Sequence, residues 1–238
     1  KDEIAIIIDR ASFINNSLKG KNWLDLCCGK GINALLLKFN KNVKYVGADL
    51  IEQNCQITRK LAKSNVICTD VHNLPFEDNS YDIVTISAAI YYLDRGKIIP
   101  EIHRVLKKNG KFIFDTSNCE LPSFITARES KGYYSALNWE NFLVKRGFKV
   151  ECFEGSIKFE KNKFQMIISN LKKIIKTILF KIPFFKERLR NLTIRYKDKF
   201  YFDKIFFYNN FTIKKKWVRN KSDNRIKPLV LYLICEKV

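Results

Sequence analysis

The 238-residue sequence lacks several features that would assign it to a specialised class of protein. It contains no C-x-x-C pair and an odd number of cysteines, seven, which excludes a disulfide framework and a regularly spaced structural zinc site. It contains no apolar run of 18 residues and no signal peptide, so we expect a cytoplasmic protein without a membrane span. No internal repeat is visible. Residue 1 is Lys rather than Met, so we expect the native N-terminus to lie further upstream.

Histidine and acidic residues are scarce, which narrows the chemistry that the chain could perform. Only His72 and His103 could act as a histidine general base, and His103 lies in a predicted helix, where we expect a surface residue. Lys and Arg outnumber Asp and Glu by 44 to 24, which gives a formal charge of +20. The hydrophobic fraction of 46% is ordinary for a globular protein, so the chain can form one good-sized core.

Short apolar segments alternate with amphipathic ones along most of the chain. The predicted strands cover residues 23–27, 44–50, 65–70, 81–87, 111–117, 149–155 and 228–238. The predicted helices cover residues 3–18, 32–39, 51–63, 93–108 and 138–148. Strands that alternate with helices of this length are typical of a parallel sheet covered on both faces, so we predict an α/β fold.

The stretch WLDLCCGKG, residues 23–31, has two interpretations: a metal or redox centre on Cys27 and Cys28, or a loop that holds a cofactor. Adjacent cysteines at a buried strand end cannot easily both bind one ion, and no further ligands stand at a suitable spacing. Gly29 and Gly31 come where a strand ends and a helix begins, where the backbone can turn sharply and a ligand can approach it closely. We therefore predict a cofactor loop with packed cysteines and no metal ion.

These residues leave more than one kind of cofactor open. The segment GKGINA, residues 29–34, also fits the relaxed dinucleotide pattern G-x-G-x-x-A, with Asp49 following at about the required distance, so an NAD-type cofactor stays open. Asp25, however, precedes Gly29 by four residues, where a carboxylate would repel a pyrophosphate and attract an ammonium group. A cofactor with an amino-acid end and a ribose end is therefore favoured.

Five motifs follow one another along the chain: DLCCGKG, VGAD, TDVHNLPF, SYDIV and EIHRVLKKNGK. In this order and spacing they resemble the class I S-adenosylmethionine-dependent methyltransferases, in particular the small-molecule group that carries an RVLKPGG segment. The resemblance covers residues 20–155 and resumes at 227–238. It implies a Rossmann-like seven-stranded sheet, mostly parallel with an antiparallel last strand. Cys27 and Asn109 each replace a glycine of the family pattern, and Asn tolerates the left-handed backbone that glycine adopts.

The resemblance implies S-adenosylmethionine as the cofactor, and it gives roles to nine residues. These are Asp25, Cys27, Gly29, Gly31, Asp49, Leu50, Asp70, Val71 and Ser87. The first four would hold the methionine end, Asp49 would accept from both ribose hydroxyls, and Leu50 would pack on the adenine. Asp70 would accept from the adenine amino group beside the Val71 backbone, with an N-cap role as its alternative. Ser87 would lie where cofactor and acceptor meet.

The acceptor side gives weaker signals. Tyr91 and Tyr92 follow the fourth strand and are candidates for lining the acceptor pocket, and His72 is a further catalytic candidate; plain packing or surface exposure is the alternative for each. Because a sulfonium methyl group is already activated, positioning can supply much of the acceleration without an acid or base. The tetrad SAAI stands where methyltransferases acting on base amino groups carry an NPPY-like tetrad, so we do not expect transfer to a base nitrogen.

Residues 156–220 differ from the rest of the chain in charge and aromatic content. They hold 18 Lys or Arg against 4 Asp or Glu, a net +14, and 14 of the 32 aromatic residues. This aromatic content favours a folded segment over a disordered tail. Within residues 164–178 the apolar side chains recur at helical spacing, and Lys172, Lys173 and Lys176 fall off that stripe.

Several interpretations of this basic segment stay open. It could be a lid whose cations hold an acidic small molecule, or a helix that lies on an anionic membrane surface. RNA binding is less favoured because no recognised RNA module is present, and nucleic acid is therefore an unlikely partner. A dimer face or a solvated lysine coat is the remaining interpretation.

These observations predict one domain: a lead-in helix at 1–19, a cofactor-binding core at 20–155, an insertion at 156–226 and a last strand at 227–238. The predicted activity is methyl transfer to oxygen or nitrogen of a small, acidic acceptor that is phosphorylated, carboxylated or glycan-linked. The alternatives are a membrane-associated lipid or quinone methyltransferase, which would lie at the inner face of a membrane, and an NAD-type nucleotide-binding protein.

Overall fold

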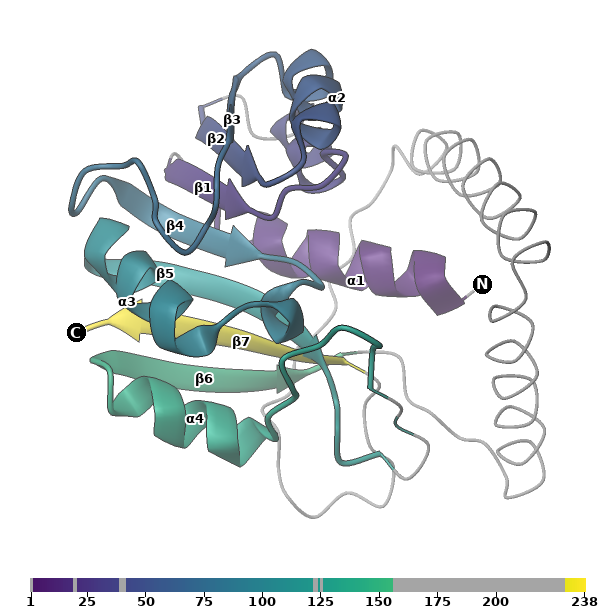
Figure 1. The fold of residues 1–238 in the computed structure, drawn as a ribbon, viewed down its shortest axis with the longest axis vertical. Coiled ribbons are helices and arrows are strands. Elements are labelled where there is room, and N and C mark those ends of the chain that lie inside the picture. Colours follow the sequence, from purple (N-terminus) through teal and green to yellow (C-terminus); the bar gives the residue numbers. More distant parts are fainter. Residues whose placement is uncertain (1, 19–20, 39–41, 122–123, 125, 156–229) are drawn as a thin grey trace. The chain divides into compact units, whose positions relative to one another are not determined.

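The computed structural model describes residues 2–18, 21–38, 42–121, 124, 126–155 and 230–238, and its central element is a seven-stranded sheet (Figure 1). The strands are β1 (Asn22–Leu26), β2 (Lys44–Asp49), β3 (Asn65–Cys68), β4 (Tyr81–Ile86), β5 (Leu106–Ser117), β6 (Phe148–Glu154) and β7 (Val230–Lys237). They lie in the order β3-β2-β1-β4-β5-β7-β6. All seven predicted strands therefore form within one sheet.

The strand directions confirm the predicted mixed sheet. β1 is parallel to β2 and β4, β2 is parallel to β3, and β4 is parallel to β5. The last strand, β7, is antiparallel to both of its neighbours, β5 and β6. The carboxyl ends of β1 to β5 consequently meet at one edge of the sheet, and the strand order reverses between β1 and β4, which is where open α/β sheets bind ligands.

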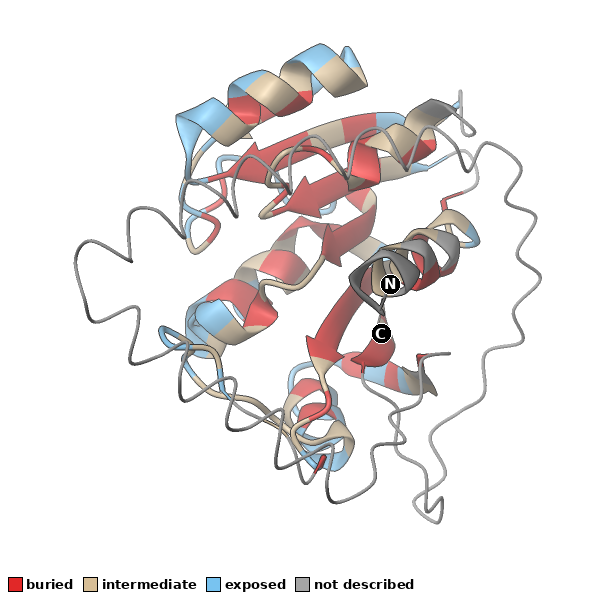
Figure 2. Cartoon of the chain, turned by 90° about the vertical axis from the view of Figure 1, so that its right-hand side faces the viewer, coloured by how far each residue is buried: buried red, intermediate tan, exposed pale blue. Residues whose placement is uncertain are grey.

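Apolar side chains cover both faces of the sheet. The helices are α1 (Asp2–Asn15), α2 (Glu52–Ala62), α3 (Arg95–Val105) and α4 (Ala136–Val144). Along β1, Leu24 and Leu26 join one buried cluster with α3 and α4, whereas Trp23 joins a second cluster with α1 and α2. This alternation follows from the two-residue period of a strand. Figure 2 shows the result, with buried strands between helices that are exposed on their outer faces.

Two predicted helices differ from the observed ones. The segment predicted as a helix at 32–39 is a short 3₁₀ helix, η1 (Asn33–Lys38). The helix predicted to run to residue 108 ends at Val105, because Leu106 already pairs with Tyr81 at the start of β5. The ladder between β4 and β5 is irregular there, and a Cβ on Gly110 would lie 2.8 Å from the carbonyl oxygen of Lys107. The sequence did not reveal that β5 begins at Leu106 with an irregular pairing to β4.

Both positions that depart from the family's glycines have a left-handed backbone. Asn109 has φ 63° and Cys27 has φ 53°, in the region that favours glycine. The prediction for Asn109 is therefore confirmed. Cys27 has a Cβ, so this left-handed conformation costs it about 1–2 kcal/mol.

Contacts divide the chain into two compact units. One unit comprises Lys1–Lys158 and Trp217–Val238, and the other comprises Phe159–Lys216. The predicted insertion at 156–226, including its basic helix, lies outside the described residues. Among the residues that are described, no helix is both long and apolar enough to cross a membrane.

Candidate active site at the carboxyl edge of the sheet

The segment that joins β1 to η1 forms a tight loop at the carboxyl edge. Its backbone is left-handed at Gly29 and Gly31, with φ 54° and 79°. A Cβ on Gly31 would lie 2.9 Å from Oγ1 of Thr58 on α2, so this position needs glycine to pack against the helix. No atom lies within 4 Å of a Cβ built on Gly29. The loop therefore leaves space for a ligand beside its own main chain.

Asp49, the last residue of β2, connects this loop to the turn before α2. Its Oδ2 accepts a hydrogen bond from the Gly29 N–H at 2.8 Å. Its Oδ1 accepts from the Ile51 N–H at 3.0 Å and from Nδ2 of Asn54 at 3.1 Å. The next residue, Leu50, is 72% exposed although it adjoins a buried carboxylate. The Asp49 carboxylate can accept hydrogen bonds from the two hydroxyls of a ribose, while the exposed Leu50 side chain can pack on the base attached to that ribose.

Asp25 lies beneath the loop rather than at its surface. It is fully buried and accepts hydrogen bonds from Oγ1 of Thr85 at 2.6 Å, Nδ2 of Asn33 at 3.0 Å and the Tyr45 hydroxyl at 3.3 Å. Burial raises the pKa of the Asp25 carboxyl to about 6, although these three donors favour its charged form. In this structure Asp25 contacts the protein, and its contact with a methionine end stays a prediction.

Asn33 extends the Asp25 network to the end of β4. Its Nδ2 also donates to Oγ of Ser87 at 3.0 Å, so one amide group joins the carboxylate of β1 to the hydroxyl after β4. This amide therefore links the carboxyl ends of β1 and β4, the two strands between which the strand order reverses. Ser87 is half-buried, and its place between cofactor and acceptor stays a prediction.

The segment after β3 places Asp70 at the surface and Val71 in the core. Asp70 Oδ1 accepts from the His72 backbone N–H at 3.0 Å and from its Nδ1 at 2.7 Å. The pKa of Asp70 is lowered, first by the His72 N–H and then by the ring. Nε2 of His72 accepts from the Asp94 N–H at 3.0 Å. Both ring nitrogens of His72 are thus engaged, and its catalytic role stays a prediction.

Aromatic side chains gather just after β4. Tyr91 and Tyr92 lie in η2 (Ile90–Tyr92), with ring centroids 4.6 Å apart. Tyr133 stacks on Tyr91 at 4.7 Å and 22°, and Phe124 meets the Tyr133 edge at 4.7 Å. Tyr92 remains 44% exposed. Four rings from two distant segments thus form one aromatic surface, which begins four residues after Ser87 along the chain.

Arg95 anchors the loop that carries Tyr133. Its Nη1 donates to the Gly132 carbonyl oxygen at 2.8 Å, and its guanidinium lies 4.1 Å from the Tyr134 ring centroid. The Lys131 N–H donates to the Tyr91 carbonyl oxygen at 2.7 Å. These contacts fix the loop before α4 against η2, so the aromatic surface is preformed.

An ion pair between α1 and β5 lies near the carboxyl edge of the sheet. Arg10 of α1 donates to both carboxylate oxygens of Asp115 on β5, from Nε at 2.7 Å and from Nη2 at 2.8 Å. Burial opposes the charge of Arg10, but Asp115 outweighs it and the pKa of the guanidinium is raised. Asp115 Oδ1 also accepts from the Ala88 N–H at 3.3 Å, next to Ser87. Helix α1 is therefore fastened to the candidate site.

No role was predicted from the sequence for several residues of this site, among them Arg10, Asn33, Thr85, Asp115 and Tyr133. Asp115 had the same signal as Asp25 and Asp49, an acid near the end of an apolar strand, and could have been found. Arg10 had none, because its partner stands 105 residues away. Tyr133 lies in a loop that no periodicity marks.

Cys28 is buried and Cys27 is half-buried, and the pKa of each thiol is raised. Burial, followed by the charges of Asp49 and Asp25, raises the pKa of Cys27 to about 12, and burial raises that of Cys28 as well. A thiol is a strong nucleophile only when deprotonated. These values support the predicted packing role.

Comparison with known proteins agrees with this geometry. Residues 24–114 match the family model described as "Methyltransferase domain". The chain is 34% identical over 117 residues to the demethylmenaquinone methyltransferase of Staphylococcus epidermidis, which covers 46% of this chain and 48% of that protein. The demethylmenaquinone methyltransferase of Thermotoga maritima is 36% identical over 93 residues, covering 38% of this chain and 41% of that protein. The chain thus spans about half the length of the curated relatives it matches.

Solved structures share the fold. A SAM-dependent methyltransferase of Archaeoglobus fulgidus has a TM-score of 0.60 at 17% identity and covers 98% of this chain and 93% of its own. A SAM-dependent methyltransferase of Thermotoga maritima has a TM-score of 0.59 at 14% identity and covers 99% and 94%. Residues 24–114 thus carry a methyltransferase domain, and the chain has the fold of class I S-adenosylmethionine-dependent methyltransferases, as the sequence predicted.

The residues at the carboxyl edge fit the cofactor of this class, S-adenosylmethionine. The open space at Gly29 can admit a ligand to the main chain, and exposed Leu50 can contact a base. The Asp49 carboxylate has two oxygens with about four acceptor sites, of which three are used here. Which residues touch the cofactor stays a prediction.

Proposed function

We propose that this protein transfers the methyl group of S-adenosylmethionine to a small acceptor that carries a planar aromatic ring. The observation that carries this proposal is the aromatic surface of Tyr91, Tyr92, Tyr133 and Phe124, which follows the carboxyl end of β4. Tyrosine rings bind flat acceptors by offset stacking or edge contacts, and each hydroxyl leaves one polar end.

The cofactor half of the proposed site lies on the other side of Ser87. Gly29, Asp49 and Leu50 would hold the adenosine, and Asp25 would support the loop from below through Asn33. Bound there, S-adenosylmethionine supplies an activated methyl group. The residues of the chain position the acceptor and exclude water. Positioning of this kind can account for most of the acceleration, so no general base is required.

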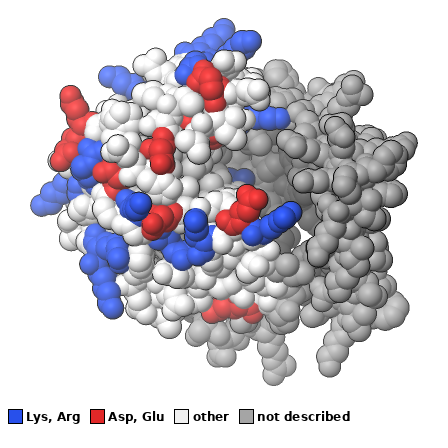
Figure 3. Space-filling view, in the orientation of Figure 1, with Lys and Arg blue, Asp and Glu red and all other residues white. Residues whose placement is uncertain are grey.

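A quinone ring is a second candidate acceptor, because the two relatives named above are demethylmenaquinone methyltransferases. A ring of that type suits the tyrosine surface as well as a smaller aromatic molecule does. The expectation of an acidic acceptor rests on residues 156–220, which lie outside the described residues. In Figure 3 the described part of the visible face carries both charge signs interspersed, so it adds no support for an anionic partner.

The test is methyl transfer from labelled S-adenosylmethionine to pools of small molecules, sorted into aromatic, aliphatic acidic and quinone sets. We expect incorporation in the aromatic or quinone set, with the methyl group on oxygen or nitrogen for a non-quinone acceptor. Incorporation in aliphatic acids alone would contradict the aromatic acceptor. Failure to bind S-adenosylhomocysteine, together with tight binding of NAD, would contradict methyl transfer itself.

A further inference from the structure

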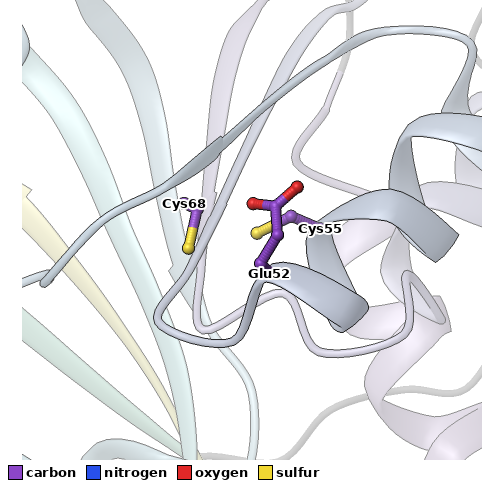
Figure 4. A group of neighbouring side chains, drawn as sticks. All are labelled: Glu52, Cys55 and Cys68. Atoms are coloured by element: carbon purple, nitrogen blue, oxygen red, sulfur yellow. The ribbon is translucent and has the colours of Figure 1, made fainter.

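Two cysteines and one glutamate meet where the β2–α2 turn lies beside the end of β3 (Figure 4). Glu52 begins α2, Cys55 lies one turn later on the same helix, and Cys68 ends β3. One ligand atom from each residue lies within 4.8 Å of the other two. Because Cys68 comes from a different element, only the tertiary structure brings it to the other two.

The three side chains lie against one another and against backbone carbonyl oxygens. The Cys68 thiol is within 4.8 Å of both the Glu52 carboxylate and the Cys55 thiol. Sγ of Cys55 lies 3.6 Å from the carbonyl oxygens of Asp49 and Ile67, and Sγ of Cys68 lies 3.4 Å from that of Leu50. Two sulfurs and several oxygens therefore converge on a small volume.

This donor set matches one kind of cation. Two thiolates and a carboxylate suit zinc, which binds sulfur at about 2.3 Å and carboxylate oxygen at about 2.0–2.2 Å. Ligand atoms around such an ion lie about 3.5–4 Å apart, so side chains whose ligand atoms are within 4.8 Å of one another need only small shifts to bind it. With three protein ligands the fourth position would be taken by water.

The competing contact of Glu52 is weak. Its Oε1 pairs with Nη1 of Arg59 at 2.8 Å, but the two side chains are 47% and 40% exposed. Exposed ion pairs contribute little to stability, so the carboxylate can turn to an ion at small cost. Glu52 and Cys68 are exposed, which gives the ion a path from solvent, while Cys55 is buried beneath them.

We propose that Glu52, Cys55 and Cys68 bind a thiophilic divalent cation, with Zn²⁺ as the natural choice, directly behind the Asp49–Leu50 turn. Binding replaces the two thiol protons, which pass to solvent, and no electron is transferred. The ion joins the start of α2 to the end of β3. This proposal does not depend on methyl transfer or on the acceptor.

The test is metal binding by the full chain, freed of metal and kept reduced with a phosphine. Zn²⁺ affinity is measured by competition with a chromophoric chelator, and Cd²⁺ is added separately because its thiolate complexes absorb in the ultraviolet. We expect one equivalent of either ion and a thiolate-to-Cd²⁺ band. Cys68→Ser should weaken Zn²⁺ binding by more than about tenfold and remove most of the band, and Glu52→Gln should weaken it about tenfold.

Cys119→Ser is the matched control, since it removes a half-buried cysteine elsewhere and should bind Zn²⁺ as the parent chain does. Thermal melts in chelator check that each variant folds. Zn²⁺ binding by Cys68→Ser and Glu52→Gln equal to that of the parent would overturn the proposal. So would the absence of a stoichiometric site, or a Cys55–Cys68 disulfide in protein purified without oxidant, which would assign the pair to redox chemistry.

Discussion

Arg10 and Asp115 form a two-pronged ion pair between α1 and β5, with N–O distances of 2.7 and 2.8 Å. Only 13% of the Arg10 side chain and 5% of the Asp115 side chain are exposed. The pair lies at the carboxyl edge of the sheet, beside the Ala88 N–H that follows β4. It holds the N-terminal helix to the part of the sheet where the acceptor is proposed to bind.

Replacing one partner of this pair should be costly, because the other charge would stay buried. We expect Arg10→Met to lower the free energy of unfolding by about 3–5 kcal/mol, measured by urea denaturation at neutral pH. The double variant Arg10→Met/Asp115→Asn should lose clearly less than the sum of the two single variants. Additive losses would mean that the two side chains do not stabilise each other.

Asp49→Ala should weaken the binding of S-adenosylhomocysteine by about 1.5–3 kcal/mol, since a charged acceptor of hydrogen bonds is lost. The Gly29 N–H would also lose its partner, which loosens the loop. Isothermal calorimetry measures the affinity. The control is Asp78→Ala, which removes an exposed carboxylate paired with Arg104 and should leave the affinity unchanged. Equal affinities for both variants would refute the ribose role of Asp49.

The Asp25 carboxyl should make stability depend on pH between about pH 4 and pH 6. Its pKa is raised from 3.8 to about 6 by burial, so the folded protein holds a proton that the unfolded chain has lost in this range. Relative to Asp25→Asn, the parent protein should therefore lose up to about 3 kcal/mol of unfolding free energy as the pH rises through this window, and no more above it.

The measurement is urea unfolding of both proteins at several pH values, with the difference plotted against pH. Taking the difference cancels the titration of other groups. The absolute value is less informative, because an amide in place of Asp25 would face the donors Thr85, Asn33 and Tyr45. A flat difference from pH 4 to pH 7 would show that Asp25 is not protonated in the folded protein.

Cys27→Gly should keep cofactor binding within about twofold, because glycine adopts the φ of 53° at this position without strain. We expect the unfolding free energy to change by less than about 1 kcal/mol, as relief of strain offsets lost packing. Cys28→Gly is the matched control: Cys28 is buried and is not among the described residues with positive φ, so the change should destabilise more. A tenfold loss of S-adenosylhomocysteine affinity in Cys27→Gly would give that thiol a binding role.

Tyr92→Ala should raise the KM for an aromatic acceptor about five- to tenfold, because a ring contact is worth about 1 kcal/mol. The affinity for S-adenosylhomocysteine should not change. The control is Leu137→Ala, which shortens an exposed apolar side chain on a different element, α4. It should alter neither the KM nor the affinity for S-adenosylhomocysteine. An unchanged KM in Tyr92→Ala would remove this ring from the acceptor site.

The sequence alone determined the fold, because the signals for it are local. Strand and helix periods predicted all seven strands, and the glycine-rich loop with acids at strand ends located the carboxyl edge. The predictions were wrong for η1, which is a 3₁₀ helix, and for the start of β5. At β5 the irregular pairing with β4 sets the backbone, and a local propensity does not reveal it.

Only the tertiary structure decided how the site is held together. The resemblance gives Asp25 a role at the methionine end of the cofactor, yet its carboxylate is held inside the protein by Thr85, Asn33 and Tyr45, which come from three separate segments. Arg10 meets Asp115, Tyr133 meets Tyr91, and Cys68 meets Cys55 across elements that no sequence period connects. The physical reason is that a strand period fixes which face a side chain points to, whereas its partner depends on the strand order and on where the helices pack.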